Sequence, residues 1–393
     1  MPTFVSKGPM ITTWYRFLER FIKIKNKNVA LLSKVTLDQT LFAPSFIAIF
    51  FTAQGMMERK SRNQILEQLE SVAYTLSSAY ATERAVAINA VLKACMQLIP
   101  CKIPSLVADF SAQAVVNLIL HKNFPDDPIV GEEDSGDLRG ESGKPLRLRV
   151  LELTNTVLDS PIDEEELLQA IDRGSYGGGS KGRMWTLDPI DGTKGFLRGE
   201  QYAICLALII DGIVQLGVVG CPNLPVDHEQ PDGEKGCLFI AVKNQGAFQR
   251  SLSSTDEKPV RFADVSSPES ASFCESTEAA HSNHDNATKI AALLGITKPP
   301  VRMDSQCKYC SVSRGDANIY LRLPVQEGYE EKIWDHASGS LLVEEAGGKV
   351  SDLYGKALDF SLGRTLKSNV GVIVAHPNIH AKVLEAVQTV CNE

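Results

Sequence analysis

The 393-residue sequence lacks the excess of positive charge that nucleic-acid-binding proteins carry. Its 48 Asp and Glu residues outnumber its 40 Lys and Arg residues, which gives a net charge of −8. Broad binding to a nucleic acid backbone needs a basic face, so the composition argues against a nucleic acid polymer as partner. A small anionic substrate stays open, because bound cations and a few well-placed basic residues reverse the sign of the local charge.

The cysteines show no disulfide framework. They number nine, which is odd, and most lie within apolar runs such as residues 203–206. This usage is typical of reduced core residues in an intracellular protein, and it predicts a cytoplasmic location. Cys307 and Cys310 form a lone C-x-x-C without a second pair or histidines at zinc spacing. A chance spacing is therefore favoured over a zinc or redox site.

Long apolar runs are scarce, and a single uncharged stretch approaches the length of a membrane span. It covers residues 40–57, TLFAPSFIAIFFTAQGMM, and a span needs about 20 such residues. The run lies too far from Met1 for a signal peptide, and no convincing cleavage site follows it. On composition alone, a membrane span and a buried helix interrupted by Pro44 are equally consistent with it.

The N-terminal residues include the segments GP (8–9), WYRFL (14–18), KVTLDQ (34–39) and FAP (42–44). With these segments they resemble the small four-helix proteins of peroxisomal and inner mitochondrial membranes. The resemblance is limited to about residues 1–70, which predicts a separate membrane-protein-like, helical N-terminal fragment. Such a fragment indicates either a fusion or a gene model that joins two neighbouring genes. Contact with a mitochondrial or peroxisomal membrane is expected only through residues 1–70.

From residue 72 onward the pattern changes to alternating helix-like and strand-like segments. Apolar residues recur at helical spacing in residues 81–98 and 112–120, and strand-like runs follow at 184–187, 203–210, 213–219 and 237–242. Asp211-Gly212 has the signature of a hairpin turn between two of these strands. Strand-like runs at 319–323 and 370–375 alternate with helical patterns at 337–346 and 379–390. This order predicts a layered α/β structure.

The strongest local motif follows the apolar run 184–187 and reads Asp188-Pro189-Ile190-Asp191-Gly192-Thr193. Two carboxylates at a strand end offer the oxygen ligands that Mg²⁺ prefers. Gly192 permits close backbone approach, and Thr193 is expected near a helix N-terminus, where N–H groups suit a phosphate. Taken alone, a D-x-x-D-G motif favours an ordinary Asx-type turn, in which Asp caps backbone amides.

Two further acidic clusters change that assessment. Glu132 lies in VGEED (130–134) after a short apolar segment, and Asp335 lies in EKIWDHA (331–337) just before a predicted helix. A single cluster of this kind is usually a solvated loop. Three clusters, each beside an apolar segment or a helix start, predict a shared site for several metal ions.

Residues 81–392 resemble the inositol monophosphatase superfamily and, within it, the 3′(2′),5′-bisphosphate nucleotidases. The resemblance rests on the motifs FPDDPIVGEED (124–134), WTLDPIDGTKGFLRGEQYAICLAL (185–208), HSNHD (281–285), DSQCKY (304–309), YLRLP (320–324), EKIWDHASG (331–339) and EEAGGKVSD (344–352). It implies a layered α-β-α-β-α sandwich of two lobes. Residues 72–255 would form the lobe with the metal site, and residues 256–393 the lobe with nucleotide-binding residues.

The resemblance also implies a magnesium-dependent phosphatase that converts adenosine 3′,5′-bisphosphate to AMP and phosphate. A second implied substrate is 3′-phosphoadenylyl sulfate, together with a role in sulfate assimilation and inhibition by lithium. Two or three Mg²⁺ ions would be held by Glu132, Asp188, the Ile190 carbonyl, Asp191 and Asp335. Catalysis would involve Thr193 and Asp188, with Thr193 positioning the attacking water. The nucleotide would be bound by Gly192, Thr193, His281, Ser305, Lys308 and Arg322.

One segment departs from the family pattern. Where the family has an aspartate that pairs with the threonine of D-G-T, this sequence has Cys101, and Leu106 replaces a threonine. A thiol is a poor partner for Mg²⁺ and a different base from a carboxylate, so we expect impaired turnover. Three alternatives therefore stand beside the active enzyme: a non-catalytic nucleotide-binding protein, an inositol phosphate phosphatase, and a membrane protein defined by residues 1–70.

Overall fold

The computed structural model describes residues 80–99, 103–277, 284–324 and 328–391. These residues belong to one compact unit, Tyr80–Glu393. The expectations for residues 1–70, including the membrane-protein-like fragment and the apolar run 40–57, lie outside the described residues. Within the described part of the chain, no helix combines the length and the apolarity that a membrane crossing requires.

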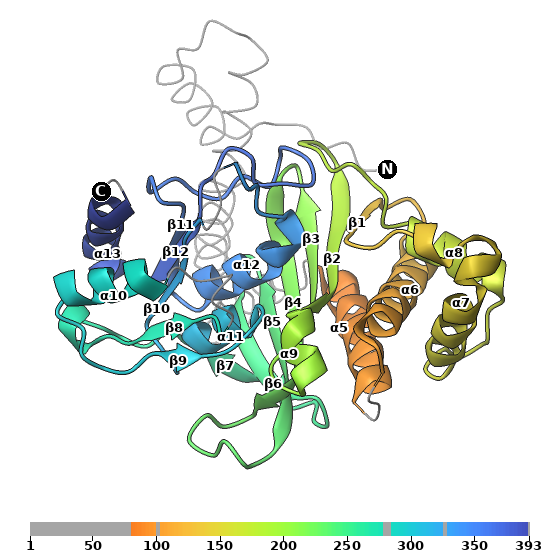
Figure 1. Ribbon diagram of the computed structural model, residues 1–393, viewed down its shortest axis with the longest axis horizontal. Helices are drawn as coiled ribbons and strands as arrows, with labels where there is room; N and C mark the ends of the chain where they lie inside the picture. The colour runs from red at the N-terminus through yellow and green to blue at the C-terminus, as the bar shows by residue number, and fades with distance from the viewer. Residues whose placement is uncertain (1–79, 100–102, 278–283, 325–327, 392–393) are drawn as a thin grey trace, which may run out of the picture. The chain divides into compact units, whose positions relative to one another are not determined.

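Two β-sheets form the framework of the unit (Figure 1). The larger sheet has the order β1-β2-β3-β4-β5-β6-β7, and the smaller sheet has the order β11-β12-β10-β8-β9. The larger sheet consists of β1 (Ile129–Gly131), β2 (Arg183–Asp191), β3 (Ala203–Ile210), β4 (Ile213–Pro225), β5 (Lys235–Val242), β6 (Gly246–Ser251) and β7 (Lys258–Val260). The smaller sheet consists of β8 (Phe273–Glu275), β9 (Val301–Arg302), β10 (Ile319–Arg322), β11 (Lys349–Ser351) and β12 (Val372–Ala375).

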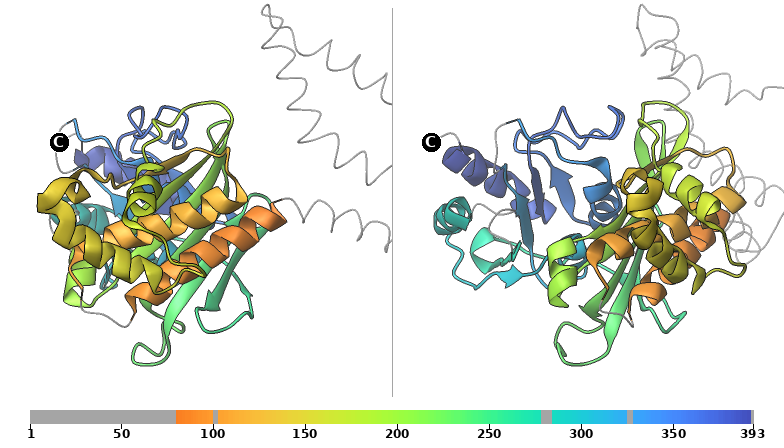
Figure 2. Two further views of the ribbon diagram at one scale, coloured as in Figure 1. Left: turned by 90° about the vertical axis from the view of Figure 1, so that its right-hand side faces the viewer. Right: turned by 45° about the vertical axis from the view of Figure 1, so that its right-hand side comes forward.

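Helices cover both faces of each sheet (Figures 1 and 2). One face of the larger sheet packs against α5 (Ala81–Leu98) and α6 (Ser105–Asn123), beyond which lie α7 (Gly140–Asn155) and α8 (Glu164–Asp172). Its other face meets α12 (Ala337–Glu345), and α11 (Cys307–Ser313) joins α12 in the layer between the sheets. The far side of the smaller sheet carries α10 (His284–Leu293) and α13 (Pro377–Cys391). The described residues also form α9 (Thr193–Arg198) and the 3₁₀ segments η2 (Gly136–Leu138), η3 (Pro268–Ser270) and η5 (Ile333–Asp335). Layers of helices therefore alternate with the two sheets, which is the predicted α-β-α-β-α sandwich.

The composition of β3 explains why the larger sheet is buried on both faces. Alternate residues Ala203, Cys205 and Ala207 pack into the core toward α11 and α12. Ile204, Leu206 and Leu208 pack on the opposite face against α5 and α6. A strand covered on both sides reads as a continuous apolar run, which is the pattern that the sequence shows. The predicted hairpin at Asp211-Gly212 is confirmed, and both residues adopt the positive φ that such a turn requires.

The pairing of β1 with β2 places two acidic segments at one edge of the larger sheet. These two strands run parallel, with Gly131 opposite Leu187. Glu132, just after β1, and Asp188, in the last part of β2, therefore lie side by side at this edge of the sheet. Parallel strands bring their carboxyl ends to the same edge of a sheet, which is where ligands bind in many α/β proteins.

Candidate active site

Glu132 and Asp188 begin the acidic side of the site. Each of these carboxyl groups affects the pKa of the other, which indicates that their side chains lie near one another. The Asp188 side chain is 2% exposed. Its Oδ1 atom is buried and has no hydrogen-bond partner. An orphaned carboxylate oxygen beside other carboxylates is what a cation site looks like without its ion.

The mutual repulsion of four carboxyl groups shows how close they lie. Burial, together with the charges of Glu132, Asp191 and Asp335, raises the pKa of Asp188 well above its ordinary value. Burial and neighbouring charges that include Asp191 raise the pKa of both Glu132 and Asp335 to about 7. Burial also raises the pKa of Asp191, against the opposing charge of Lys308. Bound cations reverse this effect by stabilising the ionised form.

Asp109 is a fifth buried carboxyl group facing this cluster. It lies on α6, is 6% exposed, and has its pKa raised to about 9 by burial and by the charges of Glu133 and Glu132. Its charge in turn contributes to the raised pKa of Asp188. A lone aspartate in an apolar helix does not reveal from the sequence which strand end it faces.

The turn after β2 depends on a close approach of two backbones. Gly192 has φ = +88°, and a Cβ atom there would lie 2.8 Å from the Cβ of Ser305. Ser305 itself adopts a positive φ of 66°, which is uncommon for a residue other than glycine and typical of functional sites. Thr193, the first residue of the six-residue α9, donates its hydroxyl to the Ile190 carbonyl at 3.4 Å.

A cavity of 330 Å³ opens beside the acidic cluster. Its acidic lining includes Asp191, Asp335 and Glu331, and Lys308 and Arg322 bring positive charge to it. The Lys308 side chain is 7% exposed, and its ammonium group lies 5.6 Å from the centre of the Tyr320 ring. Carboxylates that hold cations, opposite basic side chains that meet an anion, are an arrangement suited to a phosphorylated small molecule.

Glu331 links the basic lining to the segment that carries Asp335. Its carboxylate accepts the Nε–H of Arg322 at 2.9 Å and contacts Nε2 of His336 at 3.2 Å. Although burial opposes it, contact with His336 and Arg322 lowers the pKa of Glu331 to about 2. The ligand atoms of Glu331, Asp335 and His336 lie within 4.8 Å of one another. The positive charge of Arg322 opposes a cation at that point, so we interpret the group as an ion-pair network.

Gln306 connects the turn after β2 with the start of α12. Its backbone N–H donates to the Asp191 carboxylate, and its side-chain Nε2 donates to the Trp334 carbonyl at 2.7 Å. Its Oε1 accepts from the Ser338 hydroxyl at 2.9 Å and from the Gly339 N–H at 3.0 Å. The residue thereby fixes the spacing between Asp191 and the segment that ends in Asp335.

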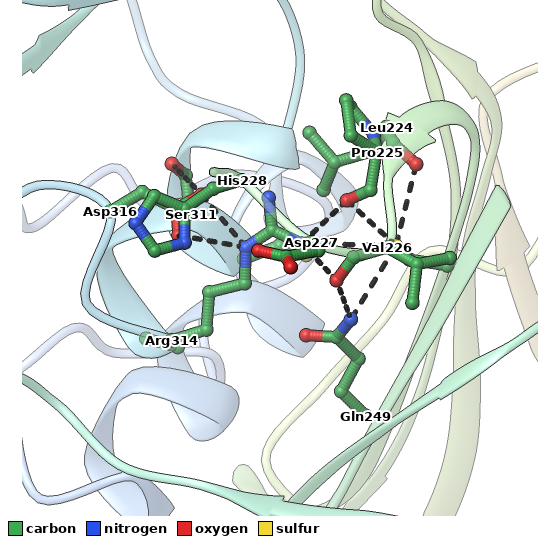
Figure 3. Close-up of polar contacts among 12 residues, drawn as sticks. Leu224, Pro225, Val226, Asp227, His228, Gln249, Ser311, Arg314 and Asp316 are labelled. Carbon is green, nitrogen blue, oxygen red and sulfur yellow. Dashed lines mark hydrogen bonds and ion pairs between the residues drawn. The ribbon is translucent and has the colours of Figure 1, made fainter. Parts of the chain in front are cut away.

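Arg314 anchors the far end of α11, the helix that carries Lys308 (Figure 3). Its Nη1 donates to the Pro225 carbonyl at the end of β4, at 2.8 Å, and its Nε pairs with Asp316 at 2.7 Å. Ser311 and His228 contact the same Asp316 carboxylate, at 2.9 and 3.3 Å. Because both contacts run to the carboxylate, this cluster is an anchor around the buried Arg314–Asp316 ion pair rather than a pair that activates a hydroxyl group.

The structure brings together most of the residues that the sequence indicated. Those that meet around the acidic cluster and the cavity are Glu132, Asp188, Ile190, Asp191, Gly192, Thr193, Ser305, Lys308, Arg322 and Asp335. His281 and Cys101 lie outside the described residues. Leu106 lies at the start of α6 and is 40% exposed. The roles of Glu331, His336, Tyr309 and Gln306 were missed, although all four lie in or beside the quoted motifs.

Three comparisons with known proteins find relatives of one family and one fold. The model of the Inositol monophosphatase family matches residues 104–391. The 3′(2′),5′-bisphosphate nucleotidase of Schizosaccharomyces pombe is 52% identical and covers 74% of this chain and 86% of its own. The 3′(2′),5′-bisphosphate nucleotidase 1 of Arabidopsis thaliana is 46% identical and covers 76% and 90%, respectively. The structure of inositol monophosphatase from Anabaena has a TM-score of 0.53 at 21% identity, covering 79% of this chain and 97% of that one. At that identity it shows the fold alone.

Proposed function

The chain belongs to the inositol monophosphatase family, and on that basis we propose that it hydrolyses adenosine 3′,5′-bisphosphate to AMP and phosphate. The names of the relatives that are 45–52% identical support this substrate class. The same chemistry extends to the 3′-phosphate of 3′-phosphoadenylyl sulfate. Both activities would support sulfate assimilation, and lithium would inhibit them.

One observation supports the proposal most strongly: four carboxyl groups converge beside a cavity whose lining also includes Lys308 and Arg322. The carboxyl groups belong to Glu132, Asp188, Asp191 and Asp335. Buried carboxyl groups raise one another's pKa and destabilise the fold unless cations or protons neutralise them. A protein that only packed its core would have no use for such a cluster.

Phosphatases of this family are metal-dependent, and we propose two or three Mg²⁺ ions for this chain. Glu132, Asp188, Asp191, Asp335 and the Ile190 carbonyl would hold them, and the orphaned Oδ1 of Asp188 fits this assignment. All of these ligands are oxygen atoms, which suits Mg²⁺ better than a thiophilic metal. Bound ions would supply positive charge at the phosphoryl group and make water a better nucleophile at neutral pH.

The chain's own residues would position the reactants. We assign Thr193, whose hydroxyl lies at the Ile190 carbonyl, to orienting the attacking water. Gly192 and Ser305 would contact the nucleotide through the closely approaching backbones at their positions. Lys308 and Arg322 would bind the phosphate that is not cleaved, because ammonium and guanidinium groups form strong charge-assisted hydrogen bonds to phosphate. His281 is assigned to the nucleotide on the sequence motif only.

We also propose a cytoplasmic enzyme with a small-molecule partner and no nucleic acid polymer. All eight cysteines within the described residues are free, and seven of them are buried. This agrees with a reducing compartment. Association with a mitochondrial or peroxisomal membrane would depend on residues 1–70.

The test is phosphate release from adenosine 3′,5′-bisphosphate by the purified full chain with Mg²⁺, compared with release from an inositol monophosphate. A clear preference for the nucleotide supports the proposal, and a preference for the inositol phosphate supports the family's other substrate class. If the chain binds the nucleotide without releasing phosphate, while Cys101→Asp restores release, it is an impaired nucleotide-binding relative.

A further inference from the structure

Glu331 is a buried carboxylate to which the proposed chemistry gives no role. It is 6% exposed and lines the cavity together with Arg322 and His336. An ionised carboxylate beside a site for an anionic substrate repels that substrate. A favourable role of Glu331 must therefore offset this repulsion of the substrate.

The contacts of Glu331 show what it does to Arg322. Its Oε1 accepts the Nε–H of Arg322 at 2.9 Å, and its Oε2 contacts His336 at 3.2 Å. A guanidinium group has a second edge, formed by its Nη atoms, that can hold two phosphate oxygens when Nε is already engaged. Arg322 itself lines the cavity. The ion pair therefore restricts the orientation in which that edge can meet a ligand.

Glu331 is in turn held by a buried chain of hydrogen bonds. The Tyr309 hydroxyl lies 2.7 Å from Nδ1 of His336. An imidazole that donates its Nε2–H to Glu331 meets the Tyr309 hydroxyl at its other nitrogen. Tyr309 is 1% exposed, and a Cβ atom on Gly339 would lie 2.4 Å from its ring. The tyrosine is therefore fixed against α12.

The three residues connected through Glu331 come from different parts of the fold. Tyr309 lies on α11, His336 stands between η5 and α12, and Arg322 ends β10. Asp335, the neighbour of His336, is assigned above to a metal ion. The orientation of Arg322 is thus linked mechanically to the backbone that carries an acidic ligand.

We propose that Glu331 is a positioning residue for the second, uncleaved phosphate: it holds the guanidinium of Arg322 toward that phosphate, and His336 and Tyr309 hold Glu331. The inference rests on the proposed function, because only a substrate with two phosphates uses this contact. An arginine that is ordered in advance loses less conformational entropy when it binds. The uncleaved phosphate then places the cleaved one at the acidic cluster, since positioning by remote groups supports catalysis.

The decisive variant is Glu331→Gln, because positioning and simple electrostatics predict opposite results. Removing a negative charge would by itself tighten the binding of an anion. If Glu331 positions Arg322, the KM for adenosine 3′,5′-bisphosphate rises about tenfold instead, as expected for the loss of one coupled pair. The KM for adenosine 3′-monophosphate, which lacks the 5′-phosphate, stays within about twofold. In an Arg322→Ala background, Glu331→Gln has no further effect on either substrate.

Glu330→Gln is the matched control. It makes the same chemical change one residue away, on an exposed side chain that contacts Thr365, and it should leave both KM values unchanged. Tyr309→Phe removes only the hydroxyl at the end of the chain. It should raise the KM for the bisphosphate selectively, by about threefold, and it decides the question if Glu331→Gln does not fold.

A lower KM for the bisphosphate in Glu331→Gln, or an equal change for both substrates, would overturn the inference. Calorimetric binding of AMP and of adenosine to the same variants separates this inference from the proposed function. AMP carries the uncleaved phosphate, and adenosine does not. If the wild-type chain releases no phosphate, the proposed function fails, and selective loss of AMP affinity in Glu331→Gln still supports the positioning role. If AMP and adenosine bind wild type equally, the positioning role is wrong.

Discussion

Ser305 occupies the space that a side chain on Gly192 would need, because a Cβ atom on Gly192 would lie 2.8 Å from the Cβ of Ser305. The contact joins the turn after β2 to the turn before α11. These two turns carry the acidic motif and the basic helix, respectively, so the contact determines how the two sides of the site meet.

Gly192→Ala should therefore destabilise the protein by about 2–4 kcal/mol, from the positive φ and the collision with Ser305 combined. Gly199→Ala is the matched control, because Gly199 also has a positive φ of 72° and no atom within 4 Å of its Cβ position. Gly199→Ala should lower the free energy of unfolding by only about 1 kcal/mol. Urea unfolding of both variants measures the difference, and equal losses would show that the contact with Ser305 carries no strain.

Asp188→Asn should remove most of the stabilisation that Mg²⁺ gives to the fold. The wild-type protein should gain about 2.7 kcal/mol when Mg²⁺ is at a hundred times its dissociation constant. Without Mg²⁺, the variant should be at least as stable as wild type, because it relieves the repulsion with Glu132. Thermal unfolding with and without Mg²⁺ checks both statements, with the exposed Asp232→Asn as control. Undiminished Mg²⁺ stabilisation in Asp188→Asn would rule out Asp188 as a ligand.

The metal-free protein should lose stability as the pH rises from 5 to 8. Burial and neighbouring carboxylates raise the folded-state pKa of Glu132 and Asp335 to about 7, from ordinary values of 4.5 and 3.8. A group with a raised folded-state pKa contributes stability that is complete below its unfolded pKa and is lost as the pH rises through the folded one. The unfolding temperature of chelator-treated protein should fall over this range.

Mg²⁺ should bind more tightly over the same pH range, because its ligands must lose their protons. The stabilisation by Mg²⁺ therefore grows as the metal-free protein weakens. The double variant Glu132→Gln, Asp335→Asn should flatten both trends. A metal-free stability that is constant or increasing between pH 5 and 8 in wild type would contradict the raised pKa values.

Gln306→Met should destabilise the protein by about 3 kcal/mol, since it leaves buried partners such as the Trp334 carbonyl and the Gly339 N–H without their hydrogen bonds. Because Gln306 spans the Asp191 and Asp335 segments, Mg²⁺ affinity should fall as well. Gln169→Met, on an exposed position of α8, is the control. Unfolding in urea and Mg²⁺ titration check the two effects separately, and an unchanged Mg²⁺ affinity would show that Gln306 supports the fold alone.

Much of the fold follows from local patterns in the sequence. The apolar run at 203–210 predicts β3 with its bounds, because a strand buried on both faces carries no polar interruption. The pattern at 81–98 likewise coincides with α5. By contrast, α7 and α8 follow one another in a charged stretch whose buried residues pack against α6, η2 and each other. Their apolar stripe is too thin to be recognised without that partner.

The candidate site likewise combines residues that local sequence patterns indicate with contacts that depend on tertiary structure. Acidic residues beside apolar segments indicate Glu132 and Asp188 as candidates, but only the parallel pairing of β1 and β2 explains why they meet. Glu331 and Arg322 are separated by nine positions, so their ion pair depends on tertiary structure. A buried carboxylate whose work is to orient another side chain has no local pattern of its own.

The most direct test of the account is the steady-state release of phosphate from adenosine 3′,5′-bisphosphate, followed with and without Mg²⁺ on wild type and Asp188→Asn. The account predicts release by the wild type that stops when Mg²⁺ is removed, and none by the variant under either condition. Release that persists without divalent cations, or that survives the loss of the Asp188 carboxylate, would contradict a metal-dependent phosphatase site at this cluster.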